Sequence, residues 1–147
     1  MRDGDSIVVL SGRTQVEVRL AEIDAPERAQ PWGRRAKQAL SDLVFGKTVE
    51  VEATDHDRYG RTVARVAADG VDVAAEMVRR GCAWVHRQYA KRAELYDLEL
   101  AARDEKVGLW SLPEAERVAP WEWRHARRAR THVGMPPDAA AQPPAPR

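Results

Sequence analysis

Short runs of alternating apolar and polar residues fill the first half of the chain, and they favour a fold with short antiparallel strands. Residues 7–10 and 16–20 are two such runs, joined by a Ser-Gly-Arg turn. They predict a β-hairpin whose polar face carries Arg19. Residues 48–53 and 62–67 flank a polar turn that contains glycine, and they predict a second hairpin.

Helical spacing is found in three segments. Residues 36–44 place apolar side chains at i, i+4, i+7 and i+8 and precede a glycine, which predicts a helix. A short helix is predicted before Gly81 and a longer one over residues 91–106. Short strands are predicted at 71–73 and 82–85. This order of elements predicts an α+β fold with a small β-barrel and disfavours a parallel α/β sheet.

The apolar residues also indicate where the domain ends. Leu, Ile, Val and Phe number 28, and 26 of them lie in residues 1–116, which are therefore predicted to form the folded domain. Residues 117–147 are predicted to be a basic segment followed by a disordered Pro/Ala-rich tail at 136–147. The arginine-rich run 124–130 has two interpretations, a nonspecific electrostatic tether for nucleic acid or the solvated end of a helix.

Charge is divided unevenly between these two parts. Residues 1–116 hold 18 Lys and Arg against 21 Asp and Glu, whereas residues 117–147 hold 6 against 2. The predicted domain is therefore slightly acidic, and its overall field would not attract a nucleic acid, because nonspecific affinity comes from neutralising phosphates. Binding to a polyanion would need a local cationic cluster, a bound cation or the basic segment.

Four groups of polar residues lie where predicted strands meet loops. They are Asp-Gly-Asp-Ser at 3–6, the single Arg19, Asp-Ala-Pro-Glu at 24–27 and Asp-Arg-Tyr-Gly-Arg at 57–61. Each group alone fits an ordinary turn or a surface ion pair. Together they supply carboxylates for a hard, oxygen-seeking cation and two arginines that can hold phosphate oxygens bidentately. Phosphodiester hydrolysis requires such a set.

In this order and spacing the motifs resemble the staphylococcal nuclease-like (thermonuclease) family. The resemblance extends through residues 77–85 and 108–111 and covers residues 3–124. It implies an α+β fold, an OB-fold five-stranded β-barrel with three packed helices. It also implies a calcium-dependent endonuclease that hydrolyses phosphodiester bonds of DNA and RNA, with single-stranded or unpaired substrate preferred.

The resemblance also implies roles for individual residues. Asp5 and Asp24 resemble the Ca²⁺-ligand carboxylates, and Ala25 lies where the family uses a backbone carbonyl. Glu27 resembles the general base that activates the attacking water, with a metal-bound water as the alternative site of that proton transfer.

The arginines and the nucleotide contacts are implied in the same way. Arg19 and Arg61 resemble the pair that stabilises charge in the transition state. The positions that resemble nucleotide contacts are Arg58, Tyr59, Arg87 and Tyr89. Relatives carry an aromatic residue where Arg87 stands, so base stacking is expected to be weaker there or replaced by stacking of the guanidinium.

A charge count supports a role for a cation. Asp5, Asp24 and Glu27 carry −3 and the two arginines, Arg19 and Arg61, carry +2, so the empty site is near −1 and would repel a phosphodiester. One Ca²⁺ would change this to +1. We therefore expect both binding and turnover to need the divalent ion.

Two other classes of function compete with this interpretation. Nuclease-like domains in interaction proteins often keep the barrel and lose the site, so a catalytically weak or inactive module that binds nucleic acid or protein is the main alternative. All five residues of the charge count are nevertheless present. A calcium sensor is disfavoured because the sequence has no twelve-residue ligand loop.

The start of the chain departs from the family pattern, since a strand normally precedes the Asp-Gly-Asp turn. We expect the first barrel strand to be truncated: either the start codon is placed too late, with a strand and a signal or anchor upstream, or the barrel closes without that strand. Localisation is left open. We expect a monomer with no obligate protein partner. Cys82 is expected to be a buried apolar residue, and His56 and His86 to be loop residues rather than ligands.

Overall fold

The computed structural model describes residues 3–134, without the side chains of 131–134. Its contacts group Met1–Arg117 into one unit and Val118–Arg147 into a second, and each unit is described by itself. No helix among the described residues is long and apolar enough to cross a membrane.

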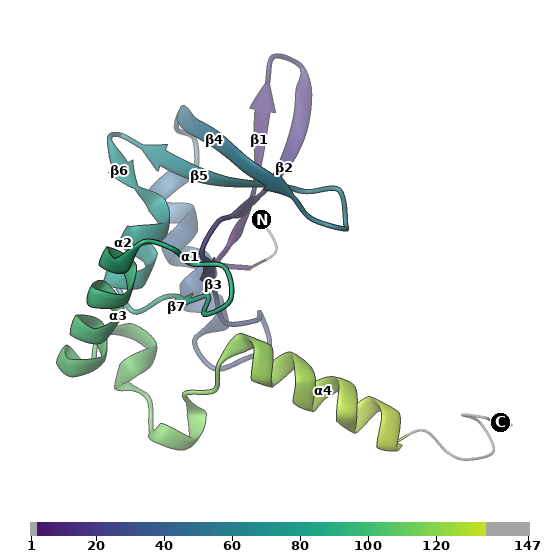
Figure 1. Ribbon diagram of the computed structural model, residues 1–147, viewed down its shortest axis with the longest axis vertical. Coiled ribbons are helices and arrows are strands. Elements are labelled where there is room, and N and C mark those ends of the chain that lie inside the picture. The colour runs from purple at the N-terminus through teal and green to yellow at the C-terminus, as the bar shows by residue number, and fades with distance from the viewer. Residues whose placement is uncertain (1–2, 135–147) are drawn as a thin grey trace, which may run out of the picture. The chain divides into compact units, whose positions relative to one another are not determined.

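A mixed sheet of five strands forms the frame of the first unit (Figure 1). Its path is β1 (Ser6–Ser11), β2 (Thr14–Leu20), β5 (Thr62–Ala68) and β4 (Val49–His56), with β6 (Val71–Asp72) paired to β5. Both predicted hairpins are confirmed, because β1 with β2 and β4 with β5 are antiparallel neighbours.

The strand β4 is longer than predicted and includes His56, which was expected in a loop. A register shift between Ala53 and Asp55 lets the pairing continue, and His56 pairs with Thr62 of β5. The prediction that His56 lies in a loop was therefore wrong. The register shift disturbs the alternation of side chains at this point, but it does not end β4. His86 lies after the last strand and outside any helix, as predicted.

The β2–β5 pair is parallel, so the prediction of antiparallel strands was wrong for this pair. The chain between these strands passes through a helix and β4, and this long connection lets β5 align in the direction of β2. The two-residue strands β3 (Ile23–Asp24) and β7 (Trp84–Val85) form a separate antiparallel pair. The α+β fold and the five-stranded sheet are confirmed, although β1 and β4 do not pair within residues 3–134, so the described strands leave the barrel open.

The three predicted helices of this unit are present as α1 (Gly33–Val44), α2 (Val73–Arg79) and α3 (Ala93–Glu105). The predicted strand at 71–73 ends one residue early, because the Asp72 side chain accepts a hydrogen bond from the Ala75 N–H and caps α2. The predicted strand at 82–85 shortens to β7. Two 3₁₀ helices follow α3, η1 (Gly108–Ser111) and η2 (Glu114–Glu116).

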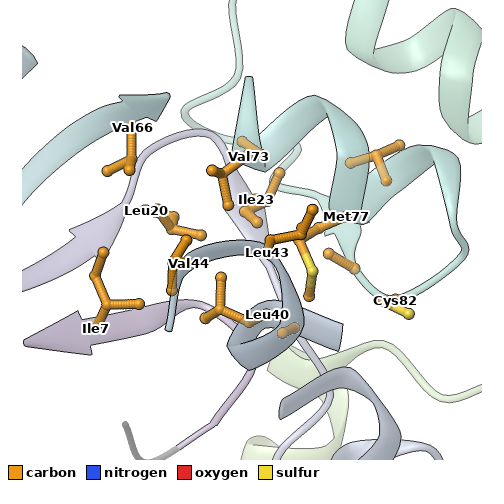
Figure 2. Packing of buried hydrophobic residues seen from close by; sticks show 14 of the residues in the cluster. Ile7, Leu20, Ile23, Leu40, Leu43, Val44, Val66, Val73, Met77 and Cys82 are labelled. Carbon is orange, nitrogen blue, oxygen red and sulfur yellow. The ribbon is translucent and has the colours of Figure 1, made fainter. Parts of the chain in front are cut away.

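The hydrophobic core joins the sheet to the helices, and Figure 2 shows part of it. Leu20 from β2, Leu40 from α1 and Met77 from α2 are fully buried there. Each such side chain contributes about 1.5–3 kcal/mol by leaving water. Cys82 is buried, as expected. The core therefore fixes β2, β3 and α1, the elements beside which the candidate site is built.

The second unit is described from residue 118 to residue 134, and its helix is α4 (Pro120–Gly134). The arginine-rich run 124–130 lies within this helix, and both of its interpretations stay predictions. The predicted tail at 136–147 lies outside the described residues.

Candidate active site

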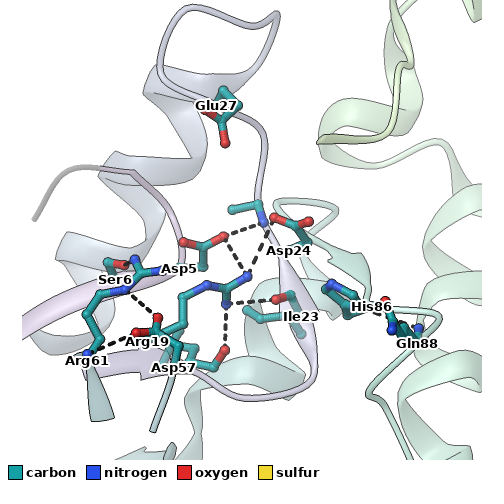
Figure 3. Close-up of polar contacts among 12 residues, drawn as sticks. Asp5, Ser6, Arg19, Ile23, Asp24, Glu27, Asp57, Arg61, His86 and Gln88 are labelled. Atoms are coloured by element: carbon teal, nitrogen blue, oxygen red, sulfur yellow. Dashed lines mark hydrogen bonds and ion pairs between the residues drawn. The ribbon is translucent and has the colours of Figure 1, made fainter. Parts of the chain in front are cut away.

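Arg19 lies at the centre of the candidate site and joins its two buried carboxylates (Figure 3). Its Nη2 is 3.5 Å from Asp5 Oδ2 and 3.6 Å from Asp24 Oδ1. Its Nη1 donates to the backbone carbonyls of Leu20 at 2.6 Å and Ile23 at 2.9 Å. Because these partners surround the planar guanidinium, its orientation is fixed by the fold.

The two carboxylates are buried, and that of Asp5 is held by a backbone N–H. Asp5 precedes β1, and its Oδ2 accepts a hydrogen bond from the N–H of Ala25 at 2.8 Å. Asp24 ends β3 and is only 1% exposed. Gly4 allows this packing, since a Cβ there would stand 2.9 Å from the Cβ of Ala25. Asp5, Asp24 and Ala25, predicted as one group, are thus brought together.

Glu27 lies in the loop between β3 and α1, and Figure 3 shows its carboxylate directed toward Asp5 and Asp24. The Glu27 N–H donates to the side-chain oxygen of Gln30 at 2.9 Å, and the Gln30 N–H donates back to the Glu27 carbonyl. Gly33 permits this loop, because a Cβ at that position would lie 1.9 Å from the Glu27 carbonyl oxygen. The start of α1 therefore sets the position of Glu27.

Arg61 approaches from the turn between β4 and β5. Asp57 accepts hydrogen bonds from Arg61 Nε at 2.7 Å and from the Arg61 N–H at 3.0 Å. Arg61 Nη1 also reaches Ser6 Oγ at 3.2 Å, next to Asp5 in the chain. Burial alone would raise the pKa of Asp57, but the hydrogen bonds from Arg61 outweigh it and lower that pKa. Asp57 therefore remains an anion that orients Arg61.

An open hollow of ≈ 910 Å³ lies beside the two arginines, and we call it the basic hollow. The β4–β5 turn and the segment after β7 contribute to its walls. The predicted contacts Arg58, Tyr59 and Tyr89 line it, and both tyrosine side chains are exposed. Its other cationic or aromatic lining residues are Arg19, His56, Arg61, Arg65, His86 and Lys91.

Arg87 is not among the residues that line the basic hollow. Its Nη2 lies 2.5 Å from Glu99 Oε1 in α3, and its Nη1 donates to the Val85 carbonyl at 2.9 Å. The other Glu99 oxygen accepts the Val85 N–H at 2.8 Å. The structure thus places Arg87 against α3, apart from the other predicted nucleotide contacts.

The donor chemistry at Asp5 and Asp24 fits a hard cation, which prefers carboxylate oxygens. Asp3 adds a third carboxyl group, and its Oδ1 is buried without a hydrogen-bond partner in the structure. Burial, with repulsion from Asp5 and Glu27, raises the pKa of Asp3 to about 7. Within residues 3–134 no three His, Cys, Asp or Glu side chains form a complete ligand group, so carbonyl or water oxygens would have to complete the coordination shell.

The sequence motifs gave no individual role to three residues that support the site. Asp57 stands four positions before Arg61 in a turn, a spacing that could have identified it as the partner of that arginine. Asp3 belongs to the Asp-Gly-Asp turn, so its motif was a signal for a third carboxyl group. Gly33 carried no such signal, because only the folded chain brings it against the Glu27 carbonyl.

Comparisons with known proteins identify the family of this chain. The family model described as staphylococcal nuclease homologue matches residues 17–112. A protein of Escherichia coli O157:H7 named an uncharacterized endonuclease is 47% identical, over 85% of this chain and 81% of that protein. A micrococcal nuclease of Shigella flexneri is 43% identical, over 88% of this chain and 80% of its own. The chain therefore belongs to the staphylococcal nuclease homologue family.

Proposed function

We propose that this protein is a calcium-dependent nuclease that cleaves both DNA and RNA. Family membership gives the reaction class, a phosphodiester hydrolase that acts as an endonuclease. One observation carries the finer proposal. Arg19 and Arg61 both line the basic hollow, while Arg19 also contacts the buried carboxylates of Asp5 and Asp24. Phosphate-binding groups and cation-binding groups therefore share one place.

The two arginines hold the phosphate and stabilise its transition state. Negative charge grows on the phosphate oxygens as water attacks, and preorganised guanidinium groups stabilise that charge without reorganising. Arg19 is fixed by its carboxylate and carbonyl partners, and Arg61 by Asp57. Arg61, which approaches from the β4–β5 turn, also serves the departing oxygen.

Glu27 orients the attacking water and accepts its proton. Its side chain is half-buried, and its carboxylate faces the other carboxylates in Figure 3, so it has a defined direction. A general base must lie within hydrogen-bond reach of the proton that it removes. The close approach of Gly33 to the Glu27 carbonyl supports such a fixed position.

Asp5, Asp24 and the Ala25 carbonyl would hold Ca²⁺. When bound, the ion supplies Lewis-acid stabilisation of phosphate charge and reverses the negative charge of the site. The residues themselves are suited to this, because Asp5 and Asp24 are buried and the Ala25 N–H fixes the Asp5 carboxylate. The buried Asp3 Oδ1 adds a further oxygen to this acidic group.

The preferred substrate in this proposal is an unpaired strand bound by a monomer. The basic hollow offers exposed aromatic rings, Tyr59 and Tyr89, on which bases can stack only when they are free of a duplex. The Arg58 guanidinium, 5.2 Å from the centroid of the Tyr59 ring, adds charge for a neighbouring phosphate. Arg87 is left out of this contact set because its guanidinium is bound to Glu99.

Cleavage of single-stranded DNA and RNA tests the proposal, with Ca²⁺ or with chelator. We expect activity only with Ca²⁺, and a loss of about 10²-fold or more in kcat for Glu27→Gln and for Arg61→Ala, both still folded. Glu17→Gln and Arg13→Ala, which change exposed residues outside the lining of the hollow, are matched controls that should retain wild-type rates. Undiminished cleavage in chelator would refute the calcium role, and full activity of Glu27→Gln would refute its role as base.

A further inference from the structure

His86 and Arg87 are neighbours in the chain with different surroundings. The His86 N–H donates to the Glu22 carbonyl at 2.9 Å, beside the paired strands β3 and β7, and the His86 side chain lines the basic hollow. Arg87 is bound to Glu99 in α3 instead. The residue that lines the hollow here is therefore His86. The family motif indicates Arg87, the next residue in the chain.

The imidazole of His86 is held against Tyr89 by local structure. Their ring centroids are 4.8 Å apart, with planes inclined at 45°. The N–H groups of Tyr89 and Ala90 both donate to the His86 carbonyl, which closes the turn between the rings. The backbone N–H of Gln88 donates to His86 Nδ1 at 3.3 Å. Because the turn already orders the two rings, little side-chain freedom is lost when a flat ligand stacks on them.

The same hollow holds the groups that bind phosphate. Arg19 and Arg61 line it together with His86 and Tyr89. In the view of Figure 3, Arg61 and His86 lie on opposite sides of the Arg19 guanidinium. A nucleotide whose phosphate lies on the arginines can therefore extend its sugar and base toward the two rings, since the hollow of ≈ 910 Å³ is of the size that holds small organic ligands.

We propose that His86 is a further specificity-determining residue of this nuclease. With Tyr89 it forms a two-ring platform that stacks on an unpaired nucleobase next to the bound phosphate. The inference rests on the proposed function for its substrate class. A base stacked on an aromatic side chain contributes substantially to affinity and tolerates any base identity, so the platform selects for an unpaired base rather than for a sequence.

Binding of short single-stranded DNA, measured by fluorescence anisotropy with Ca²⁺, tests this residue in a Glu27→Gln background that limits turnover. We expect His86→Ala to weaken binding by about five- to twentyfold. His86→Phe, which keeps a ring, should stay within about twofold of the parent. Gln88→Ala changes an exposed neighbour that does not line the hollow, so it serves as the matched control and should bind like the parent.

Abasic oligonucleotides separate stacking from a structural role. One abasic site is moved along the strand, and at the stacked position the loss caused by His86→Ala should disappear, because no base remains to contact. A loss that persists with every abasic strand, or equal binding by His86→Ala and its parent, would overturn the inference. Cleavage by the wild-type chain is measured separately. If binding depends on His86 but the wild-type chain does not hydrolyse DNA, the proposed function is refuted and the stacking platform is supported.

Discussion

The two sides of the candidate site differ in exposure: buried contacts hold the carboxylate side firmly, whereas the hollow side faces solvent. On the carboxylate side, Asp5 and Asp24 are 4% and 1% exposed, and Arg19 is bound to backbone and carboxylate groups at once. On the hollow side, Tyr59 and Tyr89 are 71% and 63% exposed. Groups that act on the reacting phosphate need fixed geometry, whereas groups that receive a flexible strand must be accessible. Substitutions on the first side should therefore reduce kcat, and substitutions on the second should change KM.

Arg19→Lys, on the firmly held side, should cause the greatest loss of activity. Lysine keeps the charge, but its single ammonium group cannot contact two carboxylates and two carbonyls in the plane that Arg19 uses. We expect kcat to fall by about 10²- to 10³-fold, with a smaller change in KM. Steady-state cleavage of single-stranded DNA measures both, and thermal denaturation confirms folding. A folded variant with a near wild-type kcat would contradict the fixed role of this guanidinium.

Gly33→Ala should have the next largest effect on activity. It displaces Glu27 but removes no charged group. The added Cβ would overlap the Glu27 carbonyl, so the loop must move. Since a displacement of about 1 Å at a reacting group can reduce the rate by about 10²-fold, we expect kcat to fall by about ten- to a hundredfold. Arg34→Ala, at the exposed next position of α1, is the control. Equal rates for both variants would show that Gly33 does not position Glu27.

Arg87→Ala should affect stability more than substrate binding. The Arg87 guanidinium bonds to the buried Glu99 and to the Val85 carbonyl. Because hydrogen bonds to charged groups contribute about 1.5–3 kcal/mol and this guanidinium is partly exposed, we expect urea denaturation to show a loss of about 1–3 kcal/mol, with KM changed less than about twofold. Tyr89→Ala should show the reverse pattern. A raised KM for Arg87→Ala with unchanged stability would show that Arg87 does contact the nucleotide.

A weaker effect concerns pH and Glu76, outside both sides of the site. Hydrogen bonds from Arg79, together with Arg80, lower the pKa of Glu76 to about 2 from an ordinary value of 4.5. Because the folded pKa is depressed, this contribution is present above pH 4.5 and is lost as the pH falls toward 2. Both arginines are exposed, so we expect only about 0.3–1 kcal/mol.

Urea denaturation between about pH 6 and pH 2 measures this contribution. Glu76→Gln should be less stable than the wild type at the upper end of that range, and the two stability curves should converge at its lower end. A constant difference between them throughout would show that the Arg79 and Arg80 contacts do not carry the effect.

Elements with strong periodicity could be predicted from the sequence. Residues 36–44 formed α1 because their apolar side chains share one helical face, and both hairpins followed from alternation around a turn. The motif residues Asp5, Arg19 and Asp24 also came together as the resemblance implied. The helix and hairpins could be predicted because they depend on local apolar patterns. The motif residues could be predicted because they follow the order and spacing of the family motifs.

Features that depend on long-range contacts could not be predicted. The strand β3 has only two residues and is specified by its partner β7, which lies far along the chain. The surroundings of Arg87 are set by its contact with Glu99 in α3, so a motif position alone could not assign it. Likewise, the parallel alignment of β5 with β2 depends on the path of the intervening chain.

The Ca²⁺ dependence of nucleic-acid affinity is the most direct test of charge reversal at the carboxylates of Asp5, Asp24 and Glu27. The test measures dissociation constants for one short single-stranded DNA at equal ionic strength, with Ca²⁺ and with chelator. They show whether these carboxylates must bind a cation before phosphate can bind. We expect binding at least about tenfold tighter with Ca²⁺, and a smaller difference for Asp24→Asn, which removes one of the carboxylates. Equal affinity of the wild-type chain in both conditions would refute the charge reversal.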